Sequence, residues 1–213
     1  MVRSKKIFEN NVDEYESWYD KYPKVYMSEI QAIKEQLQKL PENIRGIEVG
    51  LGTGRFSEPL GIKEGIEPSS AMAQKAKKRG IEVLKGTAER LPYADLTFDF
   101  VLFVTICHFS SIGKAISEAH RVLKTNGAII IGFLDKDQEI AKQYEEKRGH
   151  STFYRNAHFY PVGRIEKMLN EKGFKELAFN QTLFGKLNEI NEIQLPKKGF
   201  GEGSFVVVKA LKK

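Results

Sequence analysis

Apolar and polar positions follow two patterns along the chain, one typical of amphipathic helices and one typical of buried strands. Residues 11–40 carry aromatic and aliphatic side chains at helical spacing, and Pro23 divides this stretch into two predicted helices, the second ending at Pro41. From Arg45 onward, short apolar runs alternate with amphipathic segments. Strands that alternate with helices predict a parallel sheet with helices packed on both faces.

The predicted strands are residues 45–50, 62–67, 81–86, 98–107, 128–134, 175–184 and 204–213. The predicted helices among them are residues 55–61, 69–80, 111–127 and 161–174. The last two strands follow one another without a helix, so they predict an antiparallel hairpin at the sheet edge. The expected fold class is α/β: a Rossmann-like, doubly wound, mostly parallel seven-stranded sheet with an antiparallel C-terminal hairpin and helices on both faces.

The composition is that of an ordinary globular protein of 213 residues, with 41% hydrophobic and 29% charged residues. No apolar run approaches the roughly 20 residues that span a bilayer, and the N-terminus shows no secretory signal, so a cytoplasmic location is expected. The one cysteine, Cys107, permits no internal disulfide and argues against a cysteine-based zinc site, and no metal site is expected.

The net charge of +6 permits two interpretations. One is a partner such as RNA or an acidic substrate, and the other is a well-solvated surface rich in lysine and glutamate. The lysines are spread along the chain, alternate with glutamates and do not gather into one long tract. This dispersal favours the second interpretation.

The stretch "IEVGLGTGRF" places Gly50, Gly52 and Gly54 directly after a predicted strand. It could be a simple turn, or a turn whose backbone approaches a ligand. A dinucleotide-binding turn has the pattern G-x-G-x-x-G, but Arg55 stands where its third glycine would be. Glu67, seventeen residues after Gly50, could accept both hydroxyls of a ribose. An adenosine-type ligand is therefore favoured over a nicotinamide dinucleotide.

Four segments in register resemble a known family: "IEVGLGTGRF", "GIEPSSAM", "GTAERLPYADLTFDFVLF" and "EAHRVLKTNGAIIIGF". In order and spacing they are similar to class I S-adenosylmethionine-dependent methyltransferases, especially the ubiquinone/menaquinone-biosynthesis group with its many small-molecule enzymes. The resemblance is strong over residues 40–135. It implies a domain over residues 41–213, an N-terminal helical lid over residues 1–40, and a lid and acceptor insertion at about residues 136–160.

The resemblance implies S-adenosylmethionine as cofactor. The residues it assigns to that cofactor are Glu48, Gly50, Gly52, Gly54, Glu67, Met72, Thr87, Ala88, Glu89, Val104 and Thr105. The glycines would pass beneath the methionine part, Glu48 would face the amino group, and Glu67 would hold the ribose. Met72 and Ala88 would contact the adenine, and the backbone near Val104 and Thr105 would meet the amino-acid end. From the residues alone, Glu48 could equally be a solvated charge and Met72 a core side chain.

The sequence departs from the family at the adenine contact. The family usually has an acidic residue before Ala88, and this chain has Thr87, whose hydroxyl is a weaker acceptor than a carboxylate. Glu89 could substitute for it or could point to solvent. A less polar adenine contact is therefore expected.

His108, in "TICHFSS", is the one candidate for a catalytic side chain, as a base or as a group that orients the acceptor. A packing or capping role is an equally plain interpretation. Aromatic residues at positions 15, 18, 19, 144, 153, 154 and 159, with His150 and His158, would suit a planar or apolar acceptor or could be ordinary lid core. The expected function is methyl transfer to a small-molecule acceptor. The alternatives are an RNA or protein acceptor, and a protein that binds the cofactor without catalysis.

Overall fold

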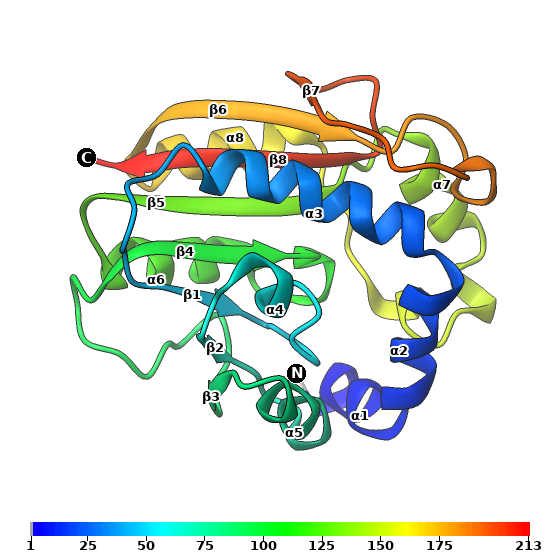
Figure 1. The fold of residues 1–213 in the computed structure, drawn as a ribbon, viewed down its shortest axis with the longest axis horizontal. Coiled ribbons are helices and arrows are strands. Elements are labelled where there is room, and N and C mark those ends of the chain that lie inside the picture. Colours follow the sequence, from blue (N-terminus) through cyan, green and yellow to red (C-terminus); the bar gives the residue numbers. More distant parts are fainter. Residues whose placement is uncertain (1) are drawn as a thin grey trace.

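The computed structural model describes residues 2–213, with side chains described from Lys6 onward. It contains an eight-stranded sheet in the order β3-β2-β1-β4-β5-β8-β6-β7 (Figure 1). The strands are β1 (Gly46–Val49), β2 (Glu64–Ile66), β3 (Glu82–Leu84), β4 (Phe98–Val104), β5 (Leu123–Leu134), β6 (Phe174–Thr182), β7 (Lys197–Lys198) and β8 (Phe205–Lys212). The strands β1 to β5 pair in parallel, and β8 pairs antiparallel with both β5 and β6. The α/β class, the mostly parallel sheet and the antiparallel C-terminal hairpin are confirmed.

The helices are α1 (Val2–Asn10), α2 (Val12–Lys21), α3 (Pro23–Leu37), α4 (Ser57–Leu60), α5 (Ser70–Lys78), α6 (Ile112–Val122), α7 (Glu139–Glu146) and α8 (Val162–Glu171). Four short 3-10 turns cover Ile106–His108, Arg148–His150, Tyr154–Asn156 and Leu187–Glu189. Pro23 is the first residue of α3, where a missing N–H costs nothing. Among the described helices, none is both long and apolar enough to cross a membrane.

Three details differ from the sequence-based predictions. The strand β7, of two residues, pairs with β6 and adds an eighth strand, so that β7 and not β6 is the last strand on this side of the sheet. The predicted C-terminal end of the helix at Gly127 was wrong, because α6 ends at Val122. Leu123 already pairs with Phe98 of β4, and Asn126 turns the chain with a φ of 62°. The helix α1 lies within the predicted helical lid, but the hydrophobic pattern indicated helices only from residue 11, since the α1 sequence is short and mostly polar.

The core consists of two layers, one on each face of the sheet. Along β4, Val101 and Phe103 face the layer that contains α6 and α8, and Phe100, Leu102 and Val104 face the layer that contains α3. This alternation follows from the two-residue period of a strand, and it explains why β4 is apolar without a break from Phe100 to Val104.

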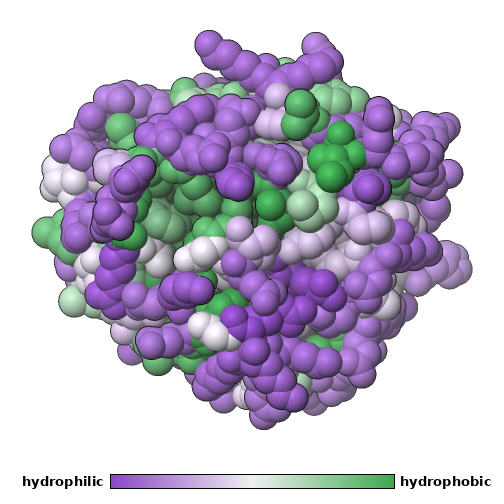
Figure 2. Space-filling view, in the orientation of Figure 1, coloured by the Kyte–Doolittle hydropathy of each residue, from purple (hydrophilic) through white to green (hydrophobic). Residues whose placement is uncertain are grey.

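The helix α3 belongs to the core of the sheet, although it lies in the N-terminal part of the chain. Its residues Val25, Ile30 and Ile33 are buried, and it packs on β5, β6 and β8. Asn180 of β6 donates to the carbonyl of Ala32 at 3.0 Å, which fixes the helix on the sheet. The helices α1 and α2 lie beyond the carboxyl ends of the parallel strands (Figure 1). Figure 2 shows the molecule in the same orientation as Figure 1. Hydrophilic residues cover most of the face seen there, with apolar residues visible between them beneath α3.

Candidate active site

The glycine-rich turn after β1 follows a left-handed backbone path. Gly50, Gly52 and Gly54 have φ angles of 74°, 58° and 81°, values that cost most residues about 1–2 kcal/mol each. The N–H of Gly50 donates to the carbonyl of Ile66 at 2.8 Å, which ties the turn to β2. Gly50 and Gly52 line a cavity of about 840 Å³ at the carboxyl ends of the strands. The first half of the turn therefore forms part of the cavity wall.

Gly54 packs against the helix α5 instead of lining the cavity. A methyl group at this position would overlap the side chain of Ile81 and would lie 3.2 Å from that of Ala76. The close packing of the turn on α5 is therefore the role that the structure gives to Gly54. Its predicted contact with a cofactor stays a prediction.

Glu67, one residue past the end of β2, connects the turn to the next helix. Its two carboxylate oxygens accept hydrogen bonds from the N–H groups of Gly52, at 2.9 Å, and of Ser69, at 2.8 Å. The side chain is only 6% exposed and lines the cavity. A buried carboxylate is thus held by backbone donors beside the glycine turn.

Glu48 lies within β1, and it is not among the residues that line the cavity. Its side chain is buried, and the hydroxyl of Ser57 donates to it. Burial raises the pKa of Glu48 to about 8, against the hydrogen bonds from Ser57 that lower it. The structure places this carboxyl behind the turn, and its predicted contact with an amino group stays a prediction.

The predicted adenine contacts gather on one side of the cavity. Met72, Thr87, Ala88 and Glu89 all line it. A carboxylate oxygen of Glu89 accepts from the N–H of Ser111 at 3.0 Å, so this side chain also holds the start of α6. The sequence permits Glu89 to point inward or to solvent, and in the structure its carboxylate is turned toward the protein.

The end of β4 and the 3-10 turn after it supply another part of the cavity wall through Val104, Thr105 and His108. Thr105 has a φ of 54°, a strained value of the kind that concentrates at functional sites. The rings of His108 and Phe8 make a T-shaped contact, with their centroids 4.9 Å apart. Burial lowers the pKa of His108 to about 4, so the imidazole is neutral at neutral pH and is a weak proton acceptor.

The far part of the cavity is lined by aromatic side chains from distant segments, and we call it the aromatic end: Trp18, Tyr19, Tyr22, Tyr144 and Tyr154. The part lined by Gly50, Gly52 and Glu67 is the glycine end. The rings of Tyr144 and Tyr154 stack with centroids 4.1 Å apart, and the indole N–H of Trp18 donates to the Tyr144 hydroxyl at 3.3 Å. His158 and Phe159, also candidates from the sequence, line a separate small hollow and not this cavity.

The sequence analysis did not name several of the residues that line the cavity, and Phe8 and Glu29 are two of them. Phe8 lies on the helix α1, which the hydrophobic pattern did not indicate. Glu29 carried a signal, because it stands four residues from both Val25 and Ile33 and therefore occupies the apolar face of α3.

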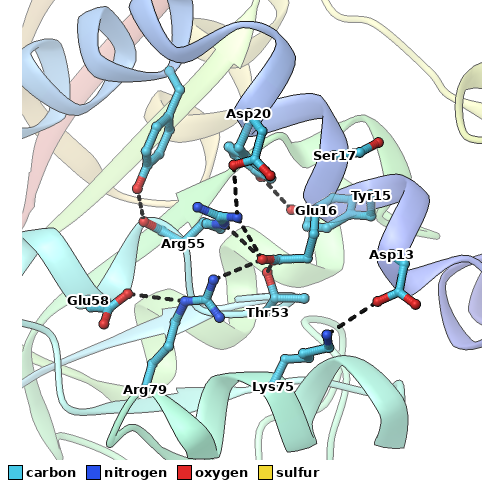
Figure 3. A network of polar contacts seen from close by, with 12 residues as sticks. Asp13, Tyr15, Glu16, Ser17, Asp20, Thr53, Arg55, Glu58, Lys75 and Arg79 are labelled. Atoms are coloured by element: carbon cyan, nitrogen blue, oxygen red, sulfur yellow. Dashed lines mark hydrogen bonds and ion pairs between the residues drawn. The ribbon is translucent and has the colours of Figure 1, made fainter.

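The helix α2 is attached to the glycine turn by a polar network (Figure 3). The carboxylate of Glu16 accepts from Arg55 at 2.7 Å and from Arg79 at 2.8 Å, and the hydroxyl of Thr53 also donates to it. Asp20 adds a longer ion pair to Arg55 at 3.6 Å. Arg55, which stands at the position of the missing third glycine, thus joins the turn to the helix above it.

Comparisons with known proteins agree with this geometry. A family model described as a methyltransferase domain matches residues 47–131. A solved structure from Thermotoga maritima, described as a S-adenosylmethionine-dependent methyltransferase and possible histamine N-methyltransferase, is 45% identical, with a TM-score of 0.93 over 99% of this chain and 100% of that one. An uncharacterised protein of Methanocaldococcus jannaschii is 42% identical over 97% of this chain and 98% of its own length. A ubiquinone/menaquinone biosynthesis C-methyltransferase of Rickettsia bellii is 28% identical over 80% of this chain and 73% of its own length.

The fold, the glycine turn and the acidic residue after β2 are those of a class I methyltransferase. With these relatives, the chain belongs to the S-adenosylmethionine-dependent methyltransferases, and its cofactor is S-adenosylmethionine. The comparisons leave the methyl acceptor open.

Proposed function

We propose that this methyltransferase acts on a small molecule that occupies the aromatic end of the cavity. The observation that carries the proposal is the enclosure of that end by Trp18, Tyr19, Tyr144 and Tyr154, within a cavity of about 840 Å³. A volume of this size fits an adenosyl amino acid together with a small acceptor. The Thermotoga relative is described with a small acceptor, histamine, which agrees with this size class.

The glycine end is the proposed place of the cofactor. The backbone of Gly50 and Gly52 would pass beneath its methionine part, and Glu67 would accept from its ribose hydroxyls. Met72 and Ala88 would contact the adenine. The residues fit this group, because the buried Glu67 carboxylate and the side-chain-free turn face the same cavity. When bound, S-adenosylmethionine supplies a methyl group activated on a sulfonium sulfur.

The protein's own contribution is then to position the acceptor and exclude water. His108 is proposed to orient the acceptor, because its low pKa makes it a weak base at neutral pH. We infer that α1, α2 and the insertion at residues 136–160 form a lid over the cavity, as the sequence analysis expected. The pairing of Glu16 with Arg55 supports this inference, since it connects α2 with the glycine turn.

The alternative acceptors, RNA or protein, would need an open basic surface beside the cavity mouth. The charges there are mixed: Glu14, Lys21 and Lys85 all line the cavity. Many lysines elsewhere pair with carboxylates, such as Lys75 with Asp13 and Lys124 with Asp99. A protein that bound the cofactor without catalysis would be expected to have a filled acceptor site.

The test is a transfer assay with S-adenosylmethionine labelled on its methyl group. Cell extract is divided into filtered metabolites, total RNA and total protein, and each fraction is offered separately. Label is expected to enter the metabolite fraction only. Label in RNA or protein would overturn the small-molecule proposal. Calorimetry with S-adenosylmethionine and with NAD verifies that the preparation binds its cofactor, with the first ligand expected to bind more tightly.

A further inference from the structure

Glu29 is a carboxyl group at the aromatic end of the cavity, on the inner face of α3. Its side chain is 5% exposed and lines the cavity, together with Tyr22 and Val25 on the same face of the helix. In the part of the chain that the structure describes, no hydrogen bond or ion pair involves the Glu29 carboxyl. An acidic group therefore faces an enclosed space without a protein partner.

This arrangement costs stability in the absence of a ligand. Burial raises the pKa of Glu29 to about 8, with no opposing hydrogen bond or cation. Glu48 is equally buried, but it has Ser57 as a partner. A buried polar group is usually hydrogen-bonded, and one that lacks a partner and faces a cavity is a candidate for ligand binding.

The groups around Glu29 are neutral aromatic hydroxyls. Glu29 raises the pKa of Tyr19, Tyr144 and Tyr154, whose own burial is the larger cause, so their side chains lie within its field. These residues come from α2, α7 and the 3-10 turn Tyr154–Asn156, the elements that surround the aromatic end. Aromatic faces and a carboxylate together recognise an organic cation, the faces through cation–π attraction and the carboxylate through a charged hydrogen bond.

Four basic side chains line the cavity, and none of them interacts with Glu29 in the described part of the chain. Lys85 and His150 are exposed. The Lys21 side chain is exposed, and its ammonium lies over the Tyr22 ring at 5.2 Å. His108 is neutral at neutral pH because burial lowers its pKa to about 4. The positive charge that would complete the site must therefore come from the ligand.

Glu29 is also separated from the glycine end. The hydroxyls of Tyr15 and Tyr19 are 2.7 Å apart. The Tyr15 hydroxyl lies beside the glycine turn, since a methyl group at Gly52 would stand 3.2 Å from it, and Glu29 raises the pKa of Tyr19. The Tyr15–Tyr19 pair thus stands between the glycine end and Glu29, and Glu29 belongs to the space left for the acceptor.

We propose that Glu29 and the surrounding aromatic side chains bind the positively charged amino group of the methyl acceptor, so that the acceptor is a small organic amine. The inference rests on the proposed function, because it requires that the aromatic end holds a small acceptor. An ammonium group stabilises the ionised form of the Glu29 carboxyl, which burial alone disfavours, whereas an anionic acceptor would disfavour that form further.

The test measures binding and does not depend on turnover. Trp18 is the one tryptophan of the chain and lines the aromatic end, so its fluorescence reports on occupancy. The protein is saturated with S-adenosylhomocysteine and titrated with benzylamine and 2-phenylethylamine, each beside its matched alcohol, benzyl alcohol or 2-phenylethanol. At least one amine is expected to bind about tenfold or more tightly than its alcohol, the size of a charged hydrogen bond.

The variant Glu29→Gln keeps the shape of the side chain and removes its charge. It is expected to lose the preference for the amine, while Glu35→Gln, on the outer part of the same helix, keeps it. If neither amine binds better than its alcohol in the wild-type protein, or if Glu29→Gln retains the preference, the proposal is wrong. The comparison of amine with alcohol in the wild-type protein needs no variant. It tests the proposal even if Glu29→Gln misfolds. Failure of the proposed function would appear separately, as label in RNA or protein in the transfer assay.

Discussion

The glycine end and the aromatic end of the cavity are built from different kinds of contact. At the glycine end, Glu67 accepts two backbone N–H bonds, and the turn itself is tied to β2. At the aromatic end, Tyr144 and Tyr154 stack on one another, and Glu29 has no partner in the described part of the chain. The carboxylate at the glycine end is held by backbone donors of the protein, and the carboxyl at the aromatic end has no such donor.

The two ends also differ in how the chain assembles them. Gly50, Gly52 and Glu67 lie within eighteen consecutive residues on β1, β2 and the turn between them. The aromatic end combines α2 and α3 with α7 and the turn Tyr154–Asn156. More than a hundred residues separate the first two elements from the last two. The glycine end, built from one short stretch of chain, can be kept for the same cofactor in many enzymes. The aromatic end, built from distant segments, can change with the acceptor.

The largest expected effect concerns the closed packing behind the glycine end. Gly54→Val is expected to lower the free energy of unfolding by about 3 kcal/mol or more. The new side chain must adopt a φ of 81° and must also displace Ile81. Chemical denaturation measures the loss.

Gly61→Val is the matched control for this packing effect. Gly61 has a φ of 73°, but a side chain there would meet nothing within 4 Å. It should show only the backbone part of the cost, about 1–2 kcal/mol. Equal losses in the two variants would mean that close packing at Gly54 contributes nothing.

The next effect concerns the unpaired acid of the aromatic end. The folded protein holds a proton on Glu29 up to about pH 8, while the unfolded chain releases it near pH 4.5. The free energy of unfolding contributed by this group therefore falls as the pH rises between those values. Relative to wild type, Glu29→Gln is expected to gain about 2–4 kcal/mol of stability between pH 5 and pH 8.

Denaturation curves of both proteins at pH 5 and at pH 8 measure this gain. The cost of burying the glutamine amide is the same at both pH values, so it does not contribute to the change between them. Tyr19, Tyr144 and Tyr154, which face Glu29, have raised pKa values and stay neutral throughout. Glu35→Gln should show no comparable change. A constant difference between Glu29→Gln and wild type would show that Glu29 titrates normally and would remove the contrast between the two ends.

The third prediction probes the satisfied acid of the glycine end. Glu67→Ala is expected to weaken the binding of S-adenosylmethionine by about 1–3 kcal/mol, because charged hydrogen bonds to the ribose are lost. Calorimetry measures the change. Glu64→Ala, on the same strand and paired with Arg45, is the control and should bind as wild type does. Unchanged affinity in Glu67→Ala would refute its ribose role.

The parts of the molecule that could be predicted are those in which neighbours in the sequence determine the structure. The apolar runs of β1, β4 and β5 and the spacing of Glu67 from Gly50 are local patterns, and they located the sheet and the glycine end. The extra strand β7 has only two residues, both exposed, and therefore no apolar pattern that could reveal it.

The aromatic end could be predicted only as a set of residue types. Its tyrosines suit a lid core as well as a ligand site, and only the folded chain shows which of them line the cavity. Phe159 does not line it, although it lies close in sequence to Tyr154, which does. Glu29 was overlooked because a single charge in an amphipathic helix is common, and its isolation becomes visible only when the surrounding elements are in place.

The smallest expected effect concerns the connection between the two ends. Glu16 of α2 binds Arg55 and Arg79, whose side chains are about four-fifths buried, and Thr53 of the glycine turn (Figure 3). Glu16→Gln is expected to reduce the free energy of local opening of α2 by about 1 kcal/mol, since partial exposure weakens the ion pairs. Amide hydrogen exchange should become several-fold faster in residues 12–21 and stay unchanged in β4 and β5.

Asp13→Asn is the control for this last effect, because the ion pair of Asp13 with Lys75 is exposed and contributes little. If Glu16→Gln accelerates exchange in α2, the helix that carries Trp18 and Tyr19 is held over the cavity through the glycine turn. Occupancy of the glycine end can then influence the aromatic end through this one helix. If exchange in α2 is unchanged, the two ends are held independently, and the aromatic end is fixed by its packing on α3 alone.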